Sequence, residues 1–225
     1  MEPTIYKPSI YKGAGIYKAG AAGGGGNVNL FDFFDAVDNI YMNDMYNAYP
    51  PYQLAETVNN DDFLLEASMY IPNISINDGA TFVVMNTYNS YSQLVYLSCP
   101  STTNPRTIRY ANNYKSNDIT TPNLSQNIEF KIDAPINAKW NNNSLTIANP
   151  DSINLSYIWP LQTKTGNAQG NAMKAGLKGM TITKKSTNKV ICQFVPVKRK
   201  IDNVVGLFEF VKGVFYSSNY FGYRL

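Results

Sequence analysis

The chain has 225 residues, of which 44% are hydrophobic and 16% are charged, and its formal net charge is +3. This composition indicates a folded protein with an uncharged polar surface, and it excludes a chain kept disordered by charge, because such chains are poor in apolar residues. Two cysteines without CxxC spacing exclude a disulfide framework, and no apolar stretch reaches the roughly 20 residues that a membrane span needs, so no membrane contact is expected.

The first 20 residues are predicted to be an extended docking arm. Pro3 and Pro8 favour extended backbone, and three glycines weaken any helix. The tripeptide Ile-Tyr-Lys occurs three times, as Ile5, Tyr6 and Lys7, as Ile10, Tyr11 and Lys12, and as Ile16, Tyr17 and Lys18. Tyrosine supplies a large contact area and a hydroxyl group at low entropic cost, so these residues are expected to bind a partner protein. The alternative is a disordered tail with a coincidental repeat.

The arm also carries most of the net charge. The first 26 residues hold Lys7, Lys12 and Lys18 against Glu2, and the remainder of the chain is nearly neutral. A neutral body lacks the basic surface of a nucleic-acid-binding protein, so no nucleic-acid partner is expected. The basic run 198–200 is interpreted as the solvated end of a strand.

A glycine-rich linker over residues 21–29 is predicted to separate the arm from a β-sandwich over 30–225. The sandwich begins with an aromatic strap over 30–52, within which 35–49 could alternatively form a short helix. The strap is expected to form the subunit interface of a dimer or trimer, or else to pack on the sandwich of its own chain. Its aromatic residues are Phe31, Phe33, Phe34, Tyr41, Tyr46 and Tyr49.

Beyond residue 61 the pattern predicts short strands separated by Asn, Gly, Pro and Ser clusters, which is typical of a β-sandwich. Residues 128–133 alternate cleanly between apolar and charged side chains, and 141–143 read as a hairpin turn. The predicted strands are 63–71, 80–85, 93–99, 106–110, 128–133, 138–140, 144–147, 157–161, 178–183, 190–197, 204–208 and 214–216.

The closing strands are more specific than their composition. They contain Phe194-Val195-Pro196-Val197-Lys198-Arg199, then Gly206-Leu207-Phe208-Glu209, then Gly213-Val214-Phe215-Tyr216. This string resembles the F-x-P-x-x-R, G-h-x-D and G-x-F-Y run (h being apolar) of the concanavalin A-like, laminin-G-like jelly rolls found in many phage tail, fibre and other virion proteins. The resemblance covers residues 50–220 and implies a jelly-roll fold. Glu209 stands where Asp is more usual, and 52–55 is a degraded form of the usual first strand.

Catalysis is not expected. The chain has no His, which removes the commonest general base and any Ser-His or Cys-His arrangement. Glu129 and Asp133 share one face of a strand with Lys131 between them. Four residues of strand separate the two carboxylates by ~13 Å, whereas paired glycosidase carboxylates lie about 5–9 Å apart. We therefore predict that the chain is not an enzyme.

No metal ion or cofactor is expected either. The candidates for calcium, Asp61, Asp62 and Asp78, are interpreted as turn residues. Cys192 lies in an apolar run and is expected to be a buried reduced thiol. Glycan binding is the alternative function, because loop aromatics and amides suit sugars. Its candidate residues are Tyr88, Asn89, Tyr91, Tyr110 and Tyr114.

Together these features predict a structural component of a bacteriophage virion, either a fibre or a decoration protein. Residues 1–20 would anchor it to a capsid or tail protein, and a homo-oligomeric jelly-roll head would be displayed outward. Its location would be the virion, after synthesis in the cytoplasm of the bacterial host. The alternative is a carbohydrate-binding module that recognises host-surface glycans.

Overall fold

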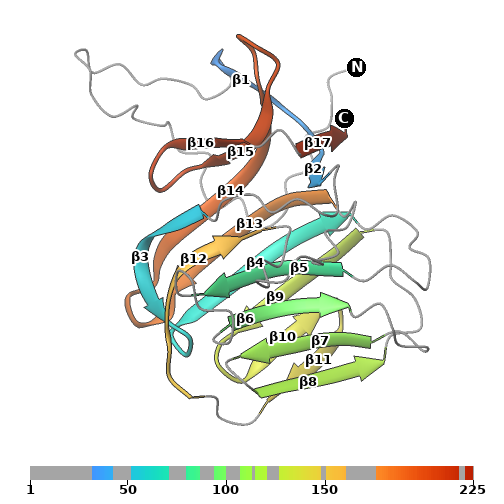
Figure 1. Ribbon diagram of the computed structural model, residues 1–225, viewed down its shortest axis with the longest axis vertical. Coiled ribbons are helices and arrows are strands. Elements are labelled where there is room, and N and C mark those ends of the chain that lie inside the picture. The colour runs from blue at the N-terminus through green and yellow to red at the C-terminus, as the bar shows by residue number, and fades with distance from the viewer. Residues whose placement is uncertain are drawn as a thin grey trace, which may run out of the picture.

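A computed structural model describes residues 32–42, 52–70, 80–86, 94–99, 107–112, 115–120, 127–147, 151–160, 176–217 and 221–224. Within these ranges the chain is almost entirely β-structure, in two antiparallel sheets that face each other (Figure 1). The predicted all-β sandwich is thereby confirmed. No helix in these ranges is long and apolar enough to cross a membrane.

The larger sheet has the strand order β11-β10-β9-β4-β13-β14-β15-β16, and β1, β2 and β17 extend it. β1 pairs with β14, while β2 pairs with both β13 and β17. The bounds of these strands are β1 Phe34–Ala36, β2 Asn39–Met42, β4 Phe63–Tyr70, β9 Asn127–Asp133, β10 Asn137–Trp140, β11 Asn143–Thr146, β13 Gly176–Lys184, β14 Lys189–Arg199, β15 Val205–Glu209, β16 Val214–Ser217 and β17 Phe221–Arg224.

The smaller sheet has the order β3-β12-β5-β6-β7-β8 and covers the inner face of the larger one (Figure 1). Its strands are β3 Tyr52–Asn59, β5 Ala80–Asn86, β6 Leu94–Cys99, β7 Thr107–Asn112, β8 Lys115–Thr120 and β12 Asn154–Trp159. All the strands predicted from the sequence are present. The sequence did not predict β8 or β17, and it gave only a weak indication of β3.

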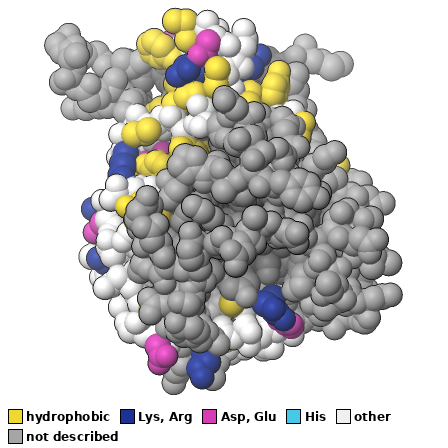
Figure 2. Space-filling model, viewed as in Figure 1, with side chains coloured by type: hydrophobic (Ala, Val, Ile, Leu, Met, Phe, Trp, Pro, Cys, Tyr) yellow, Lys and Arg dark blue, Asp and Glu magenta, His cyan; other side chains and the backbone are white. Residues whose placement is uncertain are grey.

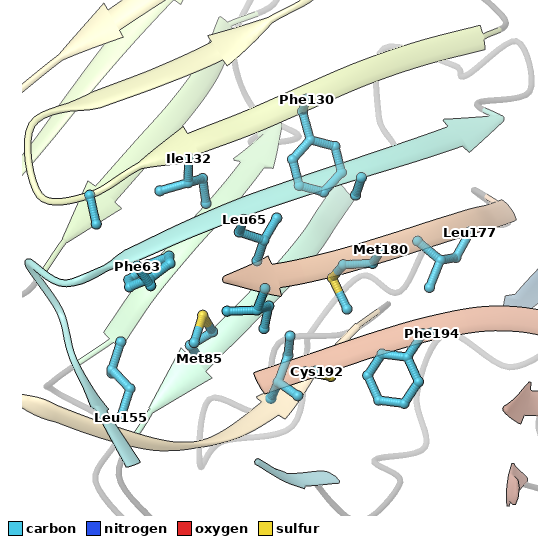
Figure 3. Close-up of a cluster of buried hydrophobic side chains, with 14 of the residues drawn as sticks. Phe63, Leu65, Met85, Phe130, Ile132, Leu155, Leu177, Met180, Cys192 and Phe194 are labelled. Atoms are coloured by element: carbon cyan, nitrogen blue, oxygen red, sulfur yellow. The ribbon is translucent and has the colours of Figure 1, made fainter. Parts of the chain in front are cut away.

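The core lies between the two sheets because the strands alternate in polarity. On β9, Ile128, Phe130 and Ile132 are buried, while the charged residues between them point outward. Met85 from β5 and Leu155 from β12 approach the same core from the smaller sheet (Figure 3).

Cys192 is a free thiol in this core, as predicted, and burial raises its pKa well above the usual value (Figure 3). The thiol is therefore neutral at ordinary pH, in keeping with a packing role for this side chain.

Strand β14 changes partner at Pro196. Up to Phe194 it pairs with β13, and from Val197 onward it pairs with β1. The N–H of Arg199 donates to the Val204 carbonyl on the β15 side, so alternation turns the nitrogen of residue 196 to the opposite side. At residue 196 the pairing of β14 with β13 has ended and its pairing with β1 has not begun, so proline costs no ladder hydrogen bond. The junction between two strand partners therefore explains why proline is tolerated within β14.

The beginning of the domain corrects one expectation. Residues 34–36 and 39–42 are strands β1 and β2 and not a helix. Phe34 is buried against its own chain, with ring centroids 5.4 Å from Phe208 and 5.2 Å from Phe215. Its assignment to a subunit interface is therefore wrong, and the alternative of packing on the same chain holds for this residue.

The other strap residues are placed differently. Phe33 is 55% exposed and Tyr41 is half-buried. Phe31, Tyr46 and Tyr49 lie outside the described residues, as do the arm and the linker. Exposed hydrophobic side chains gather at the end of the molecule that holds β1 and the turn between β14 and β15 (Figure 2).

Candidate functional site

A row of polar residues crosses the outer face of the larger sheet. The strand register aligns six of them on neighbouring strands, and all six point away from the core because their sequence neighbours are buried. From β11 to β14 they are Ser144, Lys139, Lys131, Glu66, Thr181 and Gln193.

One end of this row opens into a depression with a volume of about 360 Å³, formed by β9, β10 and β11. Its lining residues are Lys131, Asp133, Asn137, Ala138, Lys139 and Ser144. No aromatic side chain is among them. We take this depression as a candidate site in the described part of the chain.

Hairpin geometry fixes the position of these side chains. β10 and β11 are joined by a two-residue turn in which Asn141 adopts a left-handed φ of 50°. The N–H of Asn141 donates to the Glu129 carbonyl at 2.8 Å, and its Oδ1 accepts the N–H of Glu129 at 3.0 Å. Asparagine tolerates this conformation better than most residues. The turn thereby ties β11 and β10 to β9 and sets Lys139 between Lys131 and Ser144.

The charges in the depression are unevenly paired. Lys131 Nζ lies 3.6 Å from Glu66 Oε1, and Lys185 Nζ lies 3.2 Å from Asp133 Oδ1. Lys139 is exposed and has no ion-pair partner among the described residues. The site therefore carries one uncompensated positive charge.

Hydrogen-bond donors also exceed acceptors. Asn137 Oδ1 accepts the Thr146 hydroxyl at 3.2 Å, a contact that does not use the Asn137 amide N–H groups. Among the described lining residues, Asp133 is the only one with a carboxyl side chain, and it is paired with Lys185. A surface of this kind suits an anionic, hydroxyl-bearing ligand.

Two of the carboxylates considered for catalysis and for metals, Asp133 and Asp62, have structural partners. Asp133, half of the Glu129–Asp133 pair, is bound to Lys185. Both oxygens of Asp62 are engaged by Ser186, through its N–H at 2.7 Å and its hydroxyl at 2.6 Å. Burial acts to raise the pKa of Asp62, but the Ser186 hydrogen bonds and neighbouring lysines outweigh it, so the pKa is lowered.

Among the described residues, no group of three or more His, Cys, Asp or Glu side chains could hold a metal ion. Asp61 is exposed next to the β3–β4 turn, and Asp78 lies outside the described residues. These positions are consistent with the interpretation of Asp61 and Asp62 as turn residues.

Tyr110 corrects the glycan-binding expectation. Its side chain is fully buried, and its hydroxyl donates to the Pro135 carbonyl at 2.9 Å. A ring in this position cannot stack on a sugar, so its assignment to a glycan site is wrong. The other residues of that assignment, Tyr88, Asn89, Tyr91 and Tyr114, lie outside the described residues.

Tyr110 belongs to a buried polar cluster that the sequence did not reveal. Asn112 donates to the Asn60 carbonyl at 3.0 Å and accepts from the Asn60 side chain. Asn60 Oδ1 in turn accepts the N–H of Ile153 at 2.9 Å, and its Nδ2 donates to the Asp151 carbonyl at 3.0 Å. This Asn60–Asn112 cluster joins the β3–β4 turn to β7 and to the beginning of β12. Nothing distinguishes these two asparagines in so Asn-rich a sequence.

A second buried cluster forms around Glu209, the residue that stands at the Asp position of the closing string. Its side chain has no exposed surface. Oε1 accepts the N–H groups of Gln193 at 2.9 Å and Val211 at 3.0 Å, and Oε2 accepts the N–H of Lys212 at 2.8 Å and the Tyr52 hydroxyl at 2.7 Å. The Glu209 cluster closes the β15–β16 turn and attaches β3 to it.

No protein-family model matches the chain, and no curated protein is significantly similar to it. The interpretation of the site therefore rests on its geometry. That geometry provides a polar, positively charged depression on the outer sheet face, together with two buried clusters that hold the framework.

Proposed function

We propose that the chain is a structural component of a bacteriophage virion, with a jelly-roll head and an N-terminal arm that docks on a capsid or tail protein. The observation that carries this proposal is the threefold Ile-Tyr-Lys repeat directly before a run of four glycines. A peptide that builds no core of its own gains order by binding, and repeated anchor residues offset the cost of ordering it.

The closing string supports the jelly-roll part of the proposal, because its residues have framework roles. A Cβ atom at Gly206 would lie 2.5 Å from the Tyr216 carbonyl oxygen, so only glycine fits this close approach. Gly213 has a φ of 67° in the turn that Glu209 closes. The string thus encodes turns and close contacts of the framework.

Glycan binding remains the second candidate function, and the depression on β9–β11 favours it. The sugar site is then placed on the sheet face, and not at the loop aromatic residues that the sequence suggested. It offers ammonium, amide and hydroxyl groups on a rigid sheet, which is a suitable support for a binding site.

The arm is tested by replacing Tyr6, Tyr11 and Tyr17 together with Ser in the full-length chain. We expect this variant to lose incorporation into particles, because the three rings supply most of the buried contact area. The matched control replaces Lys7, Lys12 and Lys18 with Gln and is expected to incorporate at nearly the normal level, since exposed charges contribute little.

Incorporation is measured as the amount of protein that co-purifies with particles from a complementation experiment. Thermal unfolding of both variants serves to show that the head is unaffected. A tyrosine-free arm that still enters particles would refute the docking role of these residues.

A further inference from the structure

We propose that the depression formed by β9, β10 and β11 binds the carboxylate of an acidic saccharide between Lys131 and Lys139. Asn137 and Ser144 would contact the hydroxyl groups of the same sugar. This inference rests on the second candidate function, glycan binding, and is independent of virion attachment. It assigns a ligand class to that function: uronic acids and related carboxylated sugars.

The first argument is the juxtaposition of two like charges. Lys131 and Lys139 are directly opposite in the β9–β10 register, and Ser144 occupies the far side of Lys139. Directly opposed side chains lie about 4.5–5.5 Å apart at Cβ, and like charges in this arrangement destabilise a sheet. Glu66 compensates Lys131 at 3.6 Å, whereas Lys139 has only the neutral Ser144 opposite it on β11. An anion bound between the two ammonium groups would relieve their repulsion.

The second argument concerns the type of anion. A volume of about 360 Å³ lies within the usual range of ligand sites and exceeds the needs of a bare phosphate. The amide of Asn137 and the hydroxyl of Ser144 add neutral hydrogen-bonding groups beside the charges. Since none of the described lining residues is aromatic, affinity is expected from charge and hydrogen bonds, which favours a charged sugar over a neutral one.

The experiment is isothermal titration calorimetry of the full-length chain with trigalacturonate. The matched ligand is the same trisaccharide as its methyl ester, which keeps the rings and hydroxyl groups but removes the charge. Inorganic phosphate is titrated as the simple anion. We expect trigalacturonate to bind, and the ester and phosphate to bind at least about tenfold more weakly.

The variants are Lys139→Gln and Lys131→Gln, with Lys115→Gln on the exposed end of β8 as the matched control. Loss of either charge in the depression should weaken trigalacturonate binding at least about tenfold, because hydrogen bonds to charged groups are the strong ones. Lys115→Gln should bind normally. The thermal midpoint of Lys139→Gln should be equal to or above that of the unmodified chain, since the change removes a repulsion.

The proposal is overturned if trigalacturonate does not bind, if its ester binds equally well, if phosphate alone reproduces the binding, or if Lys139→Gln has no effect. Attachment is tested separately. The Tyr→Ser arm variant should keep its affinity for trigalacturonate, and Lys139→Gln should still incorporate into particles, so failure of one proposal is distinguishable from failure of the other.

Discussion

Strand β3 is held at its two ends by buried polar clusters of different kinds. At its beginning, the Tyr52 hydroxyl donates to the side chain of Glu209. Just after its end, Asn60 exchanges hydrogen bonds with Asn112 and with the backbone near β12. Three of the four donors to Glu209 are backbone N–H groups. The asparagine side chains, in contrast, each carry both a donor and an acceptor that need a partner. The comparison shows two ways to fix the ends of β3, by a buried acidic side chain and by neutral amides.

The largest expected effect is that of Glu209→Ala. This change leaves a buried hydroxyl and three backbone N–H groups without an acceptor, so the free energy of unfolding should fall by about 3–5 kcal/mol. Chemical denaturation in urea measures it. Glu66→Gln, which alters a half-exposed carboxylate on the same sheet, is the control and should change stability by less than about 1 kcal/mol. A Glu209→Ala loss as small as that of the control would mean that the charged cluster contributes little to the fold.

The neutral cluster should be less sensitive. Asn112→Ala removes an acceptor from Asn60 and a donor from two carbonyl oxygens, and we expect a loss of about 1–3 kcal/mol. Asn154→Ala, at an exposed position on β12, serves as the matched control and should have almost no effect. If Asn112→Ala costs more than Glu209→Ala in the same urea experiment, the proposed ranking of the two clusters is reversed.

Each of the two clusters contains a phenol, Tyr52 or Tyr110, whose contribution to stability can be tested at alkaline pH. Burial raises the pKa of both side chains in the folded state, and for Tyr52 the hydrogen bond to Glu209 adds to the effect. Their contribution to stability is complete below the unfolded pKa of about 10 and is lost as the pH rises above it. Each phenol should therefore lower the unfolding free energy by about 1.4 kcal/mol per pH unit above about pH 10.

Urea unfolding at a series of pH values, together with tyrosinate absorbance, measures this slope. Tyr52→Phe and Tyr110→Phe should each reduce it by the share of one phenol. An unchanged slope in both variants would show that these hydroxyl groups ionise freely in the folded state.

The smallest effect is expected from the surface pair Arg109–Asp118, which joins β7 and β8 with two contacts of 2.8 Å. Hydrogen bonding from Arg109 lowers the pKa of Asp118, so the contribution of the pair exists above the unfolded pKa and disappears as the pH falls through the folded value. Arg109→Met should cost no more than about 1 kcal/mol at neutral pH and nothing in strong acid. A larger loss, measured in the same way, would remove the distinction between surface pairs and buried clusters.

The sequence predicted the strands that have an apolar alternation, because burial of one sheet face imposes a period of two. Strand β9 is the clearest case. It did not predict β8, Lys115–Thr120, which is polar except for Ile119 and forms the edge of the smaller sheet. It also left β1 and β2 as a strap or a helix, because segments of three and four residues are too short for any period to show. Their pairing is decided by partners more than 100 residues away in the chain.

The candidate site was predictable only in part. The outward direction of Lys131 and Asp133 followed from the alternation of β9. Lys139 and Ser144 lie beside Lys131 because of the register of two hairpins. A turn signal such as 141–143 locates a hairpin but does not determine which residues pair across it. The burial of Tyr110 was not predictable, because the sequence around an aromatic residue near a turn looks the same whether its side chain faces solvent or the core.

The pairing of β1 determines how force would travel through the molecule. β1 is the first described strand, and it is hydrogen-bonded along its length to β14, with Phe34 opposite Arg199. A force directed along β1 would load this ladder lengthwise, so that its bonds resist together instead of opening one after another. The ring of Phe34 packs against Phe208 and Phe215, which adds resistance to the displacement of β1. A pull on β1 would thus reach the hairpin of β14 and β15 first.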